Sequence, residues 1–230
     1  MQPDIEKRVK LAQKSIELNR VDEADLINLS KDCLSLGTSQ KILHDILELG
    51  HLKNVSSYMS DEKFIDQWFD LVIQMIKQSN FHMGHMLRQR SNRYSDDIAF
   101  NIIKKGKLRT LTYSALWSLV IEVGRSLSAF DMEMKKPVVG LLTHNQLNGV
   151  LVDLSCLCFG YRVIPLPLNA TPEHISYIVR HSEITHLFIG GKAGTKLWSE
   201  VDDKESITII SLDDEEKTID SIQWEQFLEQ

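Results

Sequence analysis

The sequence predicts an α/β protein in which a helical N-terminal lead-in is followed by a mostly parallel sheet with helices on both faces. Between Thr110 and Gly191, short apolar runs alternate with segments of helical periodicity. Continuous apolar runs of this kind are typical of parallel strands that are buried on both faces. The first 80 residues show only the three- and four-residue spacings of amphipathic helices.

Four helices are predicted in the lead-in. The second begins after Asp22 and ends at Gly37, a residue suited to a left-handed C-cap. The third is capped by Thr38 or Ser39 and ends at Gly50. The first helix places its apolar residues on one face: Ile5, Val9, Ala12 and Ile16.

The fourth helix has the clearest pattern, and Asp61 is its expected N-cap. The pattern leaves open whether the four helices form a bundle of their own or pack on the domain that follows. The apolar residues of the fourth helix keep helical spacing throughout: Phe64, Ile65, Trp68, Phe69, Leu71, Val72, Met75 and Ile76.

The next segment introduces the sheet-forming part of the chain. A short helix with a basic end is expected over Met83–Arg90. Ile98–Ile103 is predicted to be a strand, and Lys104–Lys107 a hairpin turn. The hairpin is expected to pair Ala99–Ile103 with Arg109–Tyr113.

The alternation that follows predicts three buried strands: Val138–Leu142, Arg162–Leu168 and His186–Ile189. A helix is expected over Asn145–Phe159, and another opens at Thr171 and ends near Ser182. The helix before the first of these strands carries its apolar residues in one stripe: Leu116, Leu119, Val120, Val123, Leu127 and Phe130.

The pattern continues more weakly after Gly191. It predicts a helix over Ala193–Val201, a strand over Ile207–Leu212 and a last helix over Ile222–Leu228. Asp213–Glu216 is interpreted as an exposed acidic turn, because charge runs of this length are usually solvated.

Composition narrows the function classes. The net charge is −6 and the basic residues are scattered, so no nucleic-acid-binding patch is expected. The N-terminus has neither a basic leader nor an apolar core, so no secretory signal is expected. Gly149–Leu168 is too interrupted to span a membrane as a helix. Three cysteines are interpreted as buried, reduced thiols: Cys33, Cys156 and Cys158. Together with the features above, they favour a cytoplasmic protein.

Several residues could be mistaken for a site. Gly190–Lys196 has the composition of a phosphate loop but not its order, so a strand-to-helix turn is favoured. His82 and His85 could share a metal ion, but too few ligands lie nearby in the sequence, and a surface or capping role is favoured. Cys156 and Cys158 point about 200° apart on a helix, which favours core packing over metal binding.

His144 and Asn145 follow a predicted strand at its carboxyl end, where open α/β sheets bind ligands. Helix capping by Asn145 is favoured over ligand contact by His144. Asp153 lies in an apolar helix and is expected to reach a neighbouring polar group. For three arginines, a solvated helix end is favoured over an anion site: Arg88, Arg90 and Arg93.

Four ordered segments resemble motifs of the adenylate-forming superfamily, which includes acyl-CoA synthetases, luciferases and the adenylation domains of peptide synthetases. Leu111–Leu116 resembles its first core motif, and Leu157–Leu166 its second. Leu87–Phe100 resembles the opening helix and first strand, and Val138–Asn145 resembles a strand ending in Asn. The resemblance implies the N-terminal part of the acyl-CoA synthetase-like fold.

Two further segments, Ile175–Ile184 and Gln223–Leu228, resemble the long-chain fatty acyl-CoA synthetases. The likeness covers residues 81–230 and leaves residues 1–80 outside, which gives the expected domain division. Two departures blur the subfamily. Met134–Pro137 replaces the usual Gly-Asp before a strand, and Cys158-Phe159-Gly160 replaces Lys-Ala-Gly in the second motif.

The family's phosphate loop, a Ser/Thr/Gly-rich stretch followed by Lys, does not occur in the sequence. The family's adenine-binding segment, ribose-binding Asp and C-terminal catalytic Lys have no counterpart either. The chain is therefore expected to end just before the phosphate loop. No catalytic, cofactor-binding or metal-binding residue is assigned to it, and no cofactor is expected to bind it alone.

The resemblance implies an N-terminal segment, inactive alone, of an AMP-forming long-chain fatty acid–CoA ligase. ATP, Mg²⁺ and CoA are implied for the intact enzyme, with the remainder of the same enzyme as partner and a fatty acid as substrate. Alternatives are a related acyl-AMP or acyl-carrier-protein ligase, and a non-catalytic interaction module with a helical docking bundle. A Rossmann protein is disfavoured because no Gly-x-Gly-x-x-Gly follows a strand. Peripheral membrane contact, oligomeric state and acyl chain length are left open.

Overall fold

The computed structural model describes residues 2–18, 23–50, 62–104, 106–131, 136–202, 207–213 and 221–230. The chain divides into two compact units, Met1–Gln89 and Arg90–Gln230.

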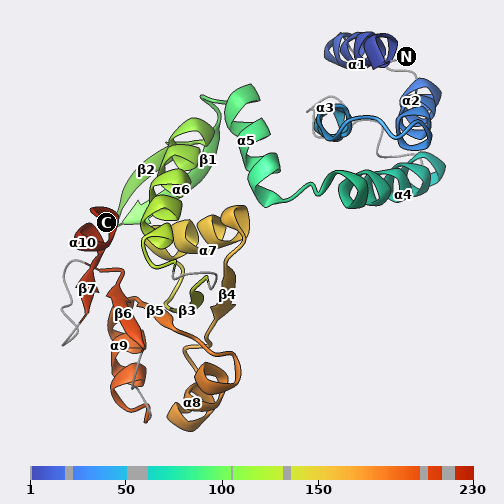
Figure 1. Ribbon diagram of the computed structural model, residues 1–230. Coiled ribbons are helices and arrows are strands. Elements are labelled where there is room, and N and C mark those ends of the chain that lie inside the picture. The colour runs from blue at the N-terminus through green and yellow to red at the C-terminus, as the bar shows by residue number, and fades with distance from the viewer. Residues whose placement is uncertain are drawn as a thin grey trace. The chain divides into compact units, whose positions relative to one another are not determined.

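The N-terminal unit is a helical bundle (Figure 1). Its helices are α1 (Gln2–Glu17), α2 (Glu23–Ser35), α3 (Gln40–Leu49) and α4 (Glu62–Ser79). Helices α1 and α4 each pack on α2 and α3, so they lie on opposite sides of that pair. One shared core joins all four helices, and each contributes an almost fully buried residue to it: Ile16, Cys33, Ile46 and Met75.

The bundle confirms the expected helices and most of their ends. Gly37 follows α2 with a φ of +59°, as its C-cap role requires. Ser39 is the N-cap of α3, but its side chain makes no capping hydrogen bond. Asp61, the expected N-cap of the fourth helix, lies outside the described residues. Helix α5 (Met83–Arg93) continues three residues beyond its predicted end.

The second unit begins with a two-stranded antiparallel hairpin, β1 (Ile98–Lys104) and β2 (Lys107–Thr112). The predicted register is wrong by one residue, because Ile103 pairs with Leu108 and not with Arg109. Tyr113 is not in the hairpin, because the hydroxyl of Thr112 accepts a hydrogen bond from Ala115 N and so begins helix α6 (Tyr113–Ser128). Four large apolar side chains of the hairpin are exposed: Ile98, Phe100, Ile103 and Leu108.

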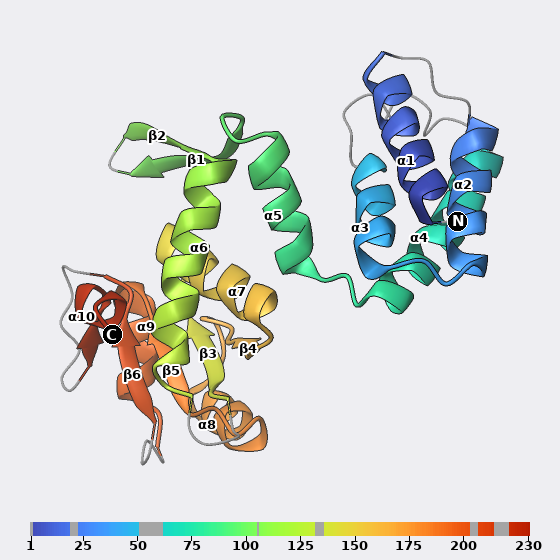
Figure 2. The same ribbon diagram turned by 45° about the horizontal axis from the view of Figure 1, so that its top comes forward.

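A five-stranded parallel sheet forms the centre of the unit, in the order β4-β3-β5-β6-β7. This confirms the predicted α/β fold with its parallel sheet. Figure 2 shows the strands between their helices. The strands are β3 (Val138–Leu142), β4 (Arg162–Pro165), β5 (His186–Ile189), β6 (Thr208–Ser211) and β7 (Ile222–Gln223). The helices are α7 (Leu147–Phe159), α8 (Pro172–His181), α9 (Gly191–Ser199) and α10 (Trp224–Leu228).

Helices cover both faces of this sheet. On one face, Ile175 and Val179 of α8 and Trp198 of α9 pack with Leu142 and Leu187 in a single core. On the other face lie α6, α7 and α10, where the Phe227 ring of α10 meets the Phe188 ring edge-on. Burial on both faces explains why the central strands are continuously apolar.

The final predicted helix is corrected by the structure. Ile222 and Gln223 are the strand β7, because they pair with Ile210 and Ser211 of β6. Only the five residues that follow form helix α10. The helical periodicity of a segment this short carries no information about its first two residues.

The cysteines behave as core residues. Cys33, Cys156 and Cys158 are all buried and free. Burial raises the pKa of Cys156 to about 12 and that of Cys158 to about 11, so both thiols stay protonated at neutral pH. Among the described helices, none is long and apolar enough to cross a membrane.

Asp153 does not make the contact expected of it. It is partly buried on α7, and none of the described residues donates a hydrogen bond to its carboxylate. Burial raises the pKa of Asp153. A raised carboxyl pKa means that the folded state disfavours the charged form, so this charge lowers stability at neutral pH.

We therefore expect Asp153→Asn to raise the free energy of unfolding at pH 7 by about 0.5–1 kcal/mol. The gain should shrink as the pH falls through the raised pKa of the folded carboxyl, and it should be lost below the pKa of about 3.9 that an Asp has in the unfolded chain. Urea unfolding of both proteins across this pH range measures the difference. Asp96→Asn, at an exposed loop position, is the control and should show no such gain. A loss of stability at pH 7 would mean that Asp153 has a stabilising partner.

Candidate functional site: the switch point of the parallel sheet

The edge of the sheet that is best placed to bind a ligand lies at the carboxyl ends of strands β3 and β5. From β3 the chain passes to β4 on one side, and it then returns to β5 on the other side of β3. In open α/β sheets, the carboxyl ends of two such strands diverge into a crevice that binds ligands. Here the residues at this edge are Thr143 and His144 after β3, and Gly190 and Gly191 after β5.

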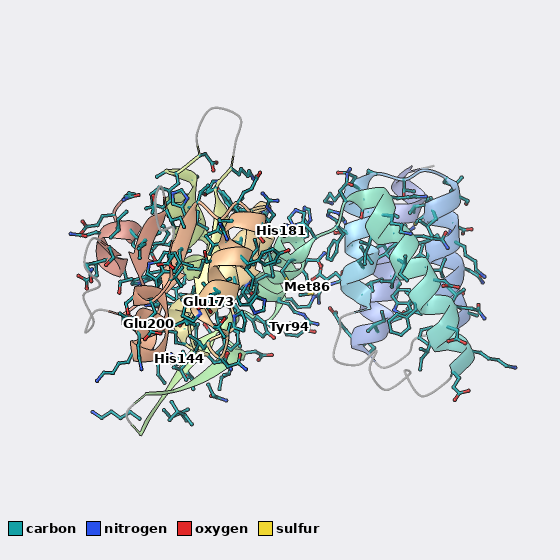
Figure 3. The ribbon with its side chains drawn as sticks, turned by 90° about the horizontal axis from the view of Figure 1, so that it is seen from below. Met86, Tyr94, His144, Glu173, His181 and Glu200 are labelled. Atoms are coloured by element: carbon teal, nitrogen blue, oxygen red, sulfur yellow. The ribbon has the colours of Figure 1, made fainter. Side chains whose placement is uncertain are left out.

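Two glycines let these loops approach each other closely. A Cβ atom at Gly190 would collide with the Gln146 amide and the Thr143 hydroxyl. Gly191 has a φ of +77°, and a Cβ atom there would lie 2.7 Å from Nδ1 of His144. The exposed His144 ring, labelled in Figure 3, therefore packs directly against the Gly191 backbone. Side chains larger than glycine would separate the two strand ends.

Gln146, not Asn145, is the N-cap residue of α7, which corrects the predicted cap. Asn145 is exposed, and the helix begins two residues later than expected. Gln146 takes an extended backbone, and its amide donates a 2.8 Å hydrogen bond to the Thr143 hydroxyl. The first turn of α7 is tied down by Asn148, whose amide donates to Leu212 O at 2.9 Å.

Asp213 is the residue at this edge that the sequence pattern did not reveal. Its carboxylate accepts a hydrogen bond from Gly191 N at the start of α9. Its own carbonyl accepts a bond from the hydroxyl of Ser211 at 3.1 Å. The carboxylate therefore occupies one N–H group of the helix N-terminus and places a negative charge where an external anion would otherwise be attracted. In sequence, Asp213 lies at the head of a charge run, and such a run gives no sign of this contact.

Replacing Asp213 with alanine should lower the free energy of unfolding by about 1 kcal/mol, because Gly191 N at the start of α9 then loses its hydrogen-bond acceptor. Asp213→Asn keeps an acceptor oxygen and should cost clearly less. Chemical denaturation of the three proteins checks the order. Equal stability of the alanine and wild-type proteins would show that the contact with Gly191 contributes nothing.

Gly190–Lys196 therefore forms the junction from strand to helix favoured from sequence, with Gly190 as the N-cap and α9 beginning at Gly191, two residues before the predicted start. The backbone of this turn is already engaged by a carboxylate from the same chain. Lys192 is exposed, and Gly194 faces Leu142 O closely enough that a Cβ atom would lie 2.6 Å from it. Neither feature cradles a phosphate. The residues of this edge hold the sheet and its helices together, and among the described residues they do not fit an ATP phosphate group.

The histidines that could have formed a metal site lie in the N-terminal unit. Nδ1 of His82 accepts from Gly84 N at 3.1 Å in the first turn of α5, which is a capping interaction. Nδ1 of His85 accepts from His82 N at 3.3 Å. An imidazole that binds metal through Nε2 needs a proton on Nδ1, so these bonds compete with metal binding. The described residues contain no group of three or more metal-ligating side chains.

The arginines of α5 are not a free cationic end. Arg88 is exposed, but Arg90 stacks over the Tyr94 ring at 5.5 Å from its centroid. Arg93 also has a partner in the structure. Two of the three side chains thus have partners in the structure, which agrees with the preference for a helix end over an anion site.

Part of the sequence matches a known protein family. The sequence model of the family described as "AMP-binding enzyme" matches residues 87–229. A search of curated proteins found no match.

Solved structures share the fold at low identity. Coronafacic acid ligase from Pectobacterium brasiliense superposes with a TM-score of 0.54 at 16% identity, over 65% of this chain and 30% of that one. A benzoate CoA ligase from Burkholderia xenovorans gives 0.52 at 15% identity, over 65% and 28%. The acyl-CoA synthetase of Brucella canis gives 0.54 at 18% identity, over 65% and 27%.

The chain spans less than a third of the length of these three proteins. Their common fold agrees with the parallel sheet and the flanking helices described above. The family match covers more than half of the present sequence, from α5 to the end of α10. The chain therefore belongs to the AMP-binding enzyme family.

Proposed function

We propose that the chain is the N-terminal segment of an AMP-forming acid–CoA ligase whose acid substrate is a long-chain fatty acid. The observation that carries the proposal is the family match over residues 87–229 together with the parallel sheet. Several structural neighbours are themselves described as acid–CoA ligases or acyl-CoA synthetases. In such an enzyme a carboxylate attacks the α-phosphorus of ATP and releases pyrophosphate, and the CoA thiol then attacks the acyl carbon of the acyl-adenylate and releases AMP.

Within that enzyme, we assign residues 1–80 to a separate helical module and residues 81–230 to the first part of the synthetase domain. Residues 81–230 contribute one layer of sheet and part of a wall of the acyl pocket. ATP, Mg²⁺ and CoA would be held by other parts of the enzyme, because the turn after β5 is engaged by Asp213. No chemical step is assigned to a residue of this chain.

The first test is the protein that carries this chain, assayed for acid-dependent exchange of pyrophosphate into ATP. Hexadecanoate, octanoate and benzoate form the substrate panel, and thioester formation is followed after CoA is added. Among the acids that support exchange, we expect hexadecanoate to give the strongest signal. We also expect a CoA thioester to form after CoA is added. Exchange without thioester formation would support an acyl-AMP or carrier-protein ligase instead. The absence of exchange with every acid would overturn the ligase proposal.

The second test uses the 230-residue chain alone in a calorimetric titration with Mg·ATP. We expect no binding in the micromolar range, because the described residues offer no phosphate loop. Micromolar affinity would contradict the assignment of the nucleotide site to other parts of the enzyme. The same titration with the Asp213→Ala protein is the matched control, because this variant lacks the carboxylate that binds Gly191 N at the turn.

A further inference from the structure

Helix α4 carries a second apolar stripe that faces away from the bundle core. Its buried stripe consists of Phe64, Trp68, Leu71, Met75 and Ser79. Phe69, Ile73 and Ile76 are 57%, 48% and 37% exposed, respectively. Their spacing of four and three residues places these three side chains on one line along the helix. Single exposed apolar residues are ordinary, but an aligned set of three marks an interaction surface.

The charged residues beside this stripe are arranged asymmetrically. Asp70 and Lys77 each follow a stripe residue by one position, so both lie on the same flank and are seven residues apart. Ile65 and Val72 are on the opposite flank, and both are partly buried. One flank is therefore charged with both signs, and the other is apolar.

This pattern is self-complementary when two copies of α4 run antiparallel. With a twofold axis at Ile73, that side chain meets its own copy, and Phe69 meets Ile76 on both sides of the axis. In antiparallel helix pairs, flanking positions of the same kind face each other. Asp70 of one copy then lies beside Lys77 of the other, twice per dimer. A parallel pair would instead place Asp70 and Lys77 beside the apolar flank, where neither charge finds a partner.

We propose that α4 is a homodimerisation surface, on which a second copy of this chain binds antiparallel through Phe69, Ile73 and Ile76 with two Asp70–Lys77 ion pairs. The inference does not depend on the proposed ligase activity. The stripe is short compared with obligate interfaces, so the dimer is expected to be reversible, with a dissociation constant on the order of micromolar.

Sedimentation equilibrium of the full chain over a range of concentrations measures this association. Ile73→Asp places two carboxylates at the twofold axis and should raise the dissociation constant by more than about tenfold. Because Ile73 is half-exposed, circular dichroism should show an unchanged helical fold. Leu11→Asp is the matched control: Leu11 is 55% exposed on α1, on the other side of α2 and α3, and the change should leave the dimer intact.

A charge exchange tests the orientation. Asp70→Lys and Lys77→Asp should each weaken the dimer, and the double variant should restore it, because the ion pairs form again with their signs reversed. Ile73→Cys should form an intermolecular disulfide, whereas Gln67→Cys, exposed elsewhere on α4, should not. The native cysteines are buried and should give little background.

Three outcomes would overturn the proposal. They are a monomer at all concentrations, a dimer that Ile73→Asp leaves unchanged, and a double charge variant that is no stronger than the single ones. A monomer in which Ile73 is protected from solvent would show that the stripe is covered by the same chain.

Discussion

Replacing Phe227 with alanine is expected to lower the free energy of unfolding by about 3–5 kcal/mol, because it leaves a large cavity beside the sheet. Phe227 is fully buried, although it belongs to the five-residue helix α10. Its ring centroid lies 5.2 Å from that of Phe188, 5.4 Å from Trp224 and 6.0 Å from Phe130. This one side chain therefore joins the last helix to strand β5 and to the end of α6.

Urea denaturation followed by tryptophan fluorescence measures the loss, and Trp224 reports on the same neighbourhood. Glu229→Ala, at an exposed position just after α10, is the control and should stay within about 0.5 kcal/mol of wild type. A loss of less than about 1 kcal/mol for Phe227→Ala would mean that α10 does not dock on the sheet as described.

Gly194→Ala is expected to destabilise the protein by about 2–3 kcal/mol, although alanine favours helices by about 1 kcal/mol over glycine. A Cβ atom at Gly194 would lie 2.6 Å from the backbone oxygen of Leu142. Leu142 is the last residue of β3, and its carbonyl is held by a hydrogen bond from Gly190 N at 3.1 Å, so α9 would have to move off the sheet. The opposition between helix propensity and packing makes the sign of the result informative.

Lys192→Ala on the same helix is the control, because Lys192 is exposed and the change should be neutral or slightly stabilising. Thermal denaturation of both variants is sufficient to compare them. A more stable Gly194→Ala protein would show that α9 lies farther from β3 than the structure places it.

Much of the fold follows from local patterns that have a physical cause. Val138–Leu142 is buried along its whole length, as a central parallel strand must be. Thr171 caps α8 by accepting a hydrogen bond from His174 N, and Pro172 occupies the first turn. Such signals lie within a few residues of the element that they specify, so the sequence shows them directly.

The errors concern features that depend on residues far apart in the chain. Asp213 reaches Gly191 across 22 positions, and no local pattern marks that contact. Ile222 becomes a strand residue only because β6 offers it a partner. The choice between Asn145 and Gln146 as the cap depends on where Thr143 lies in space. Of the exposed stripe on α4, the predicted apolar pattern contains Phe69 and Ile76 but not Ile73. The pattern also does not say which side of the helix the bundle covers.

The hairpin of β1 and β2 has a consequence for how the protein must be handled. A ribbon of only two strands leaves backbone donors and acceptors open along its outer sides, where a strand from another molecule can add. Ile103 and Leu108, paired near its tip, make such addition more favourable. The exposed Lys107 beside the turn opposes it, because its positive charge repels the same residue of an approaching molecule. Low ionic strength should therefore protect concentrated samples from aggregation, and high salt should remove that protection.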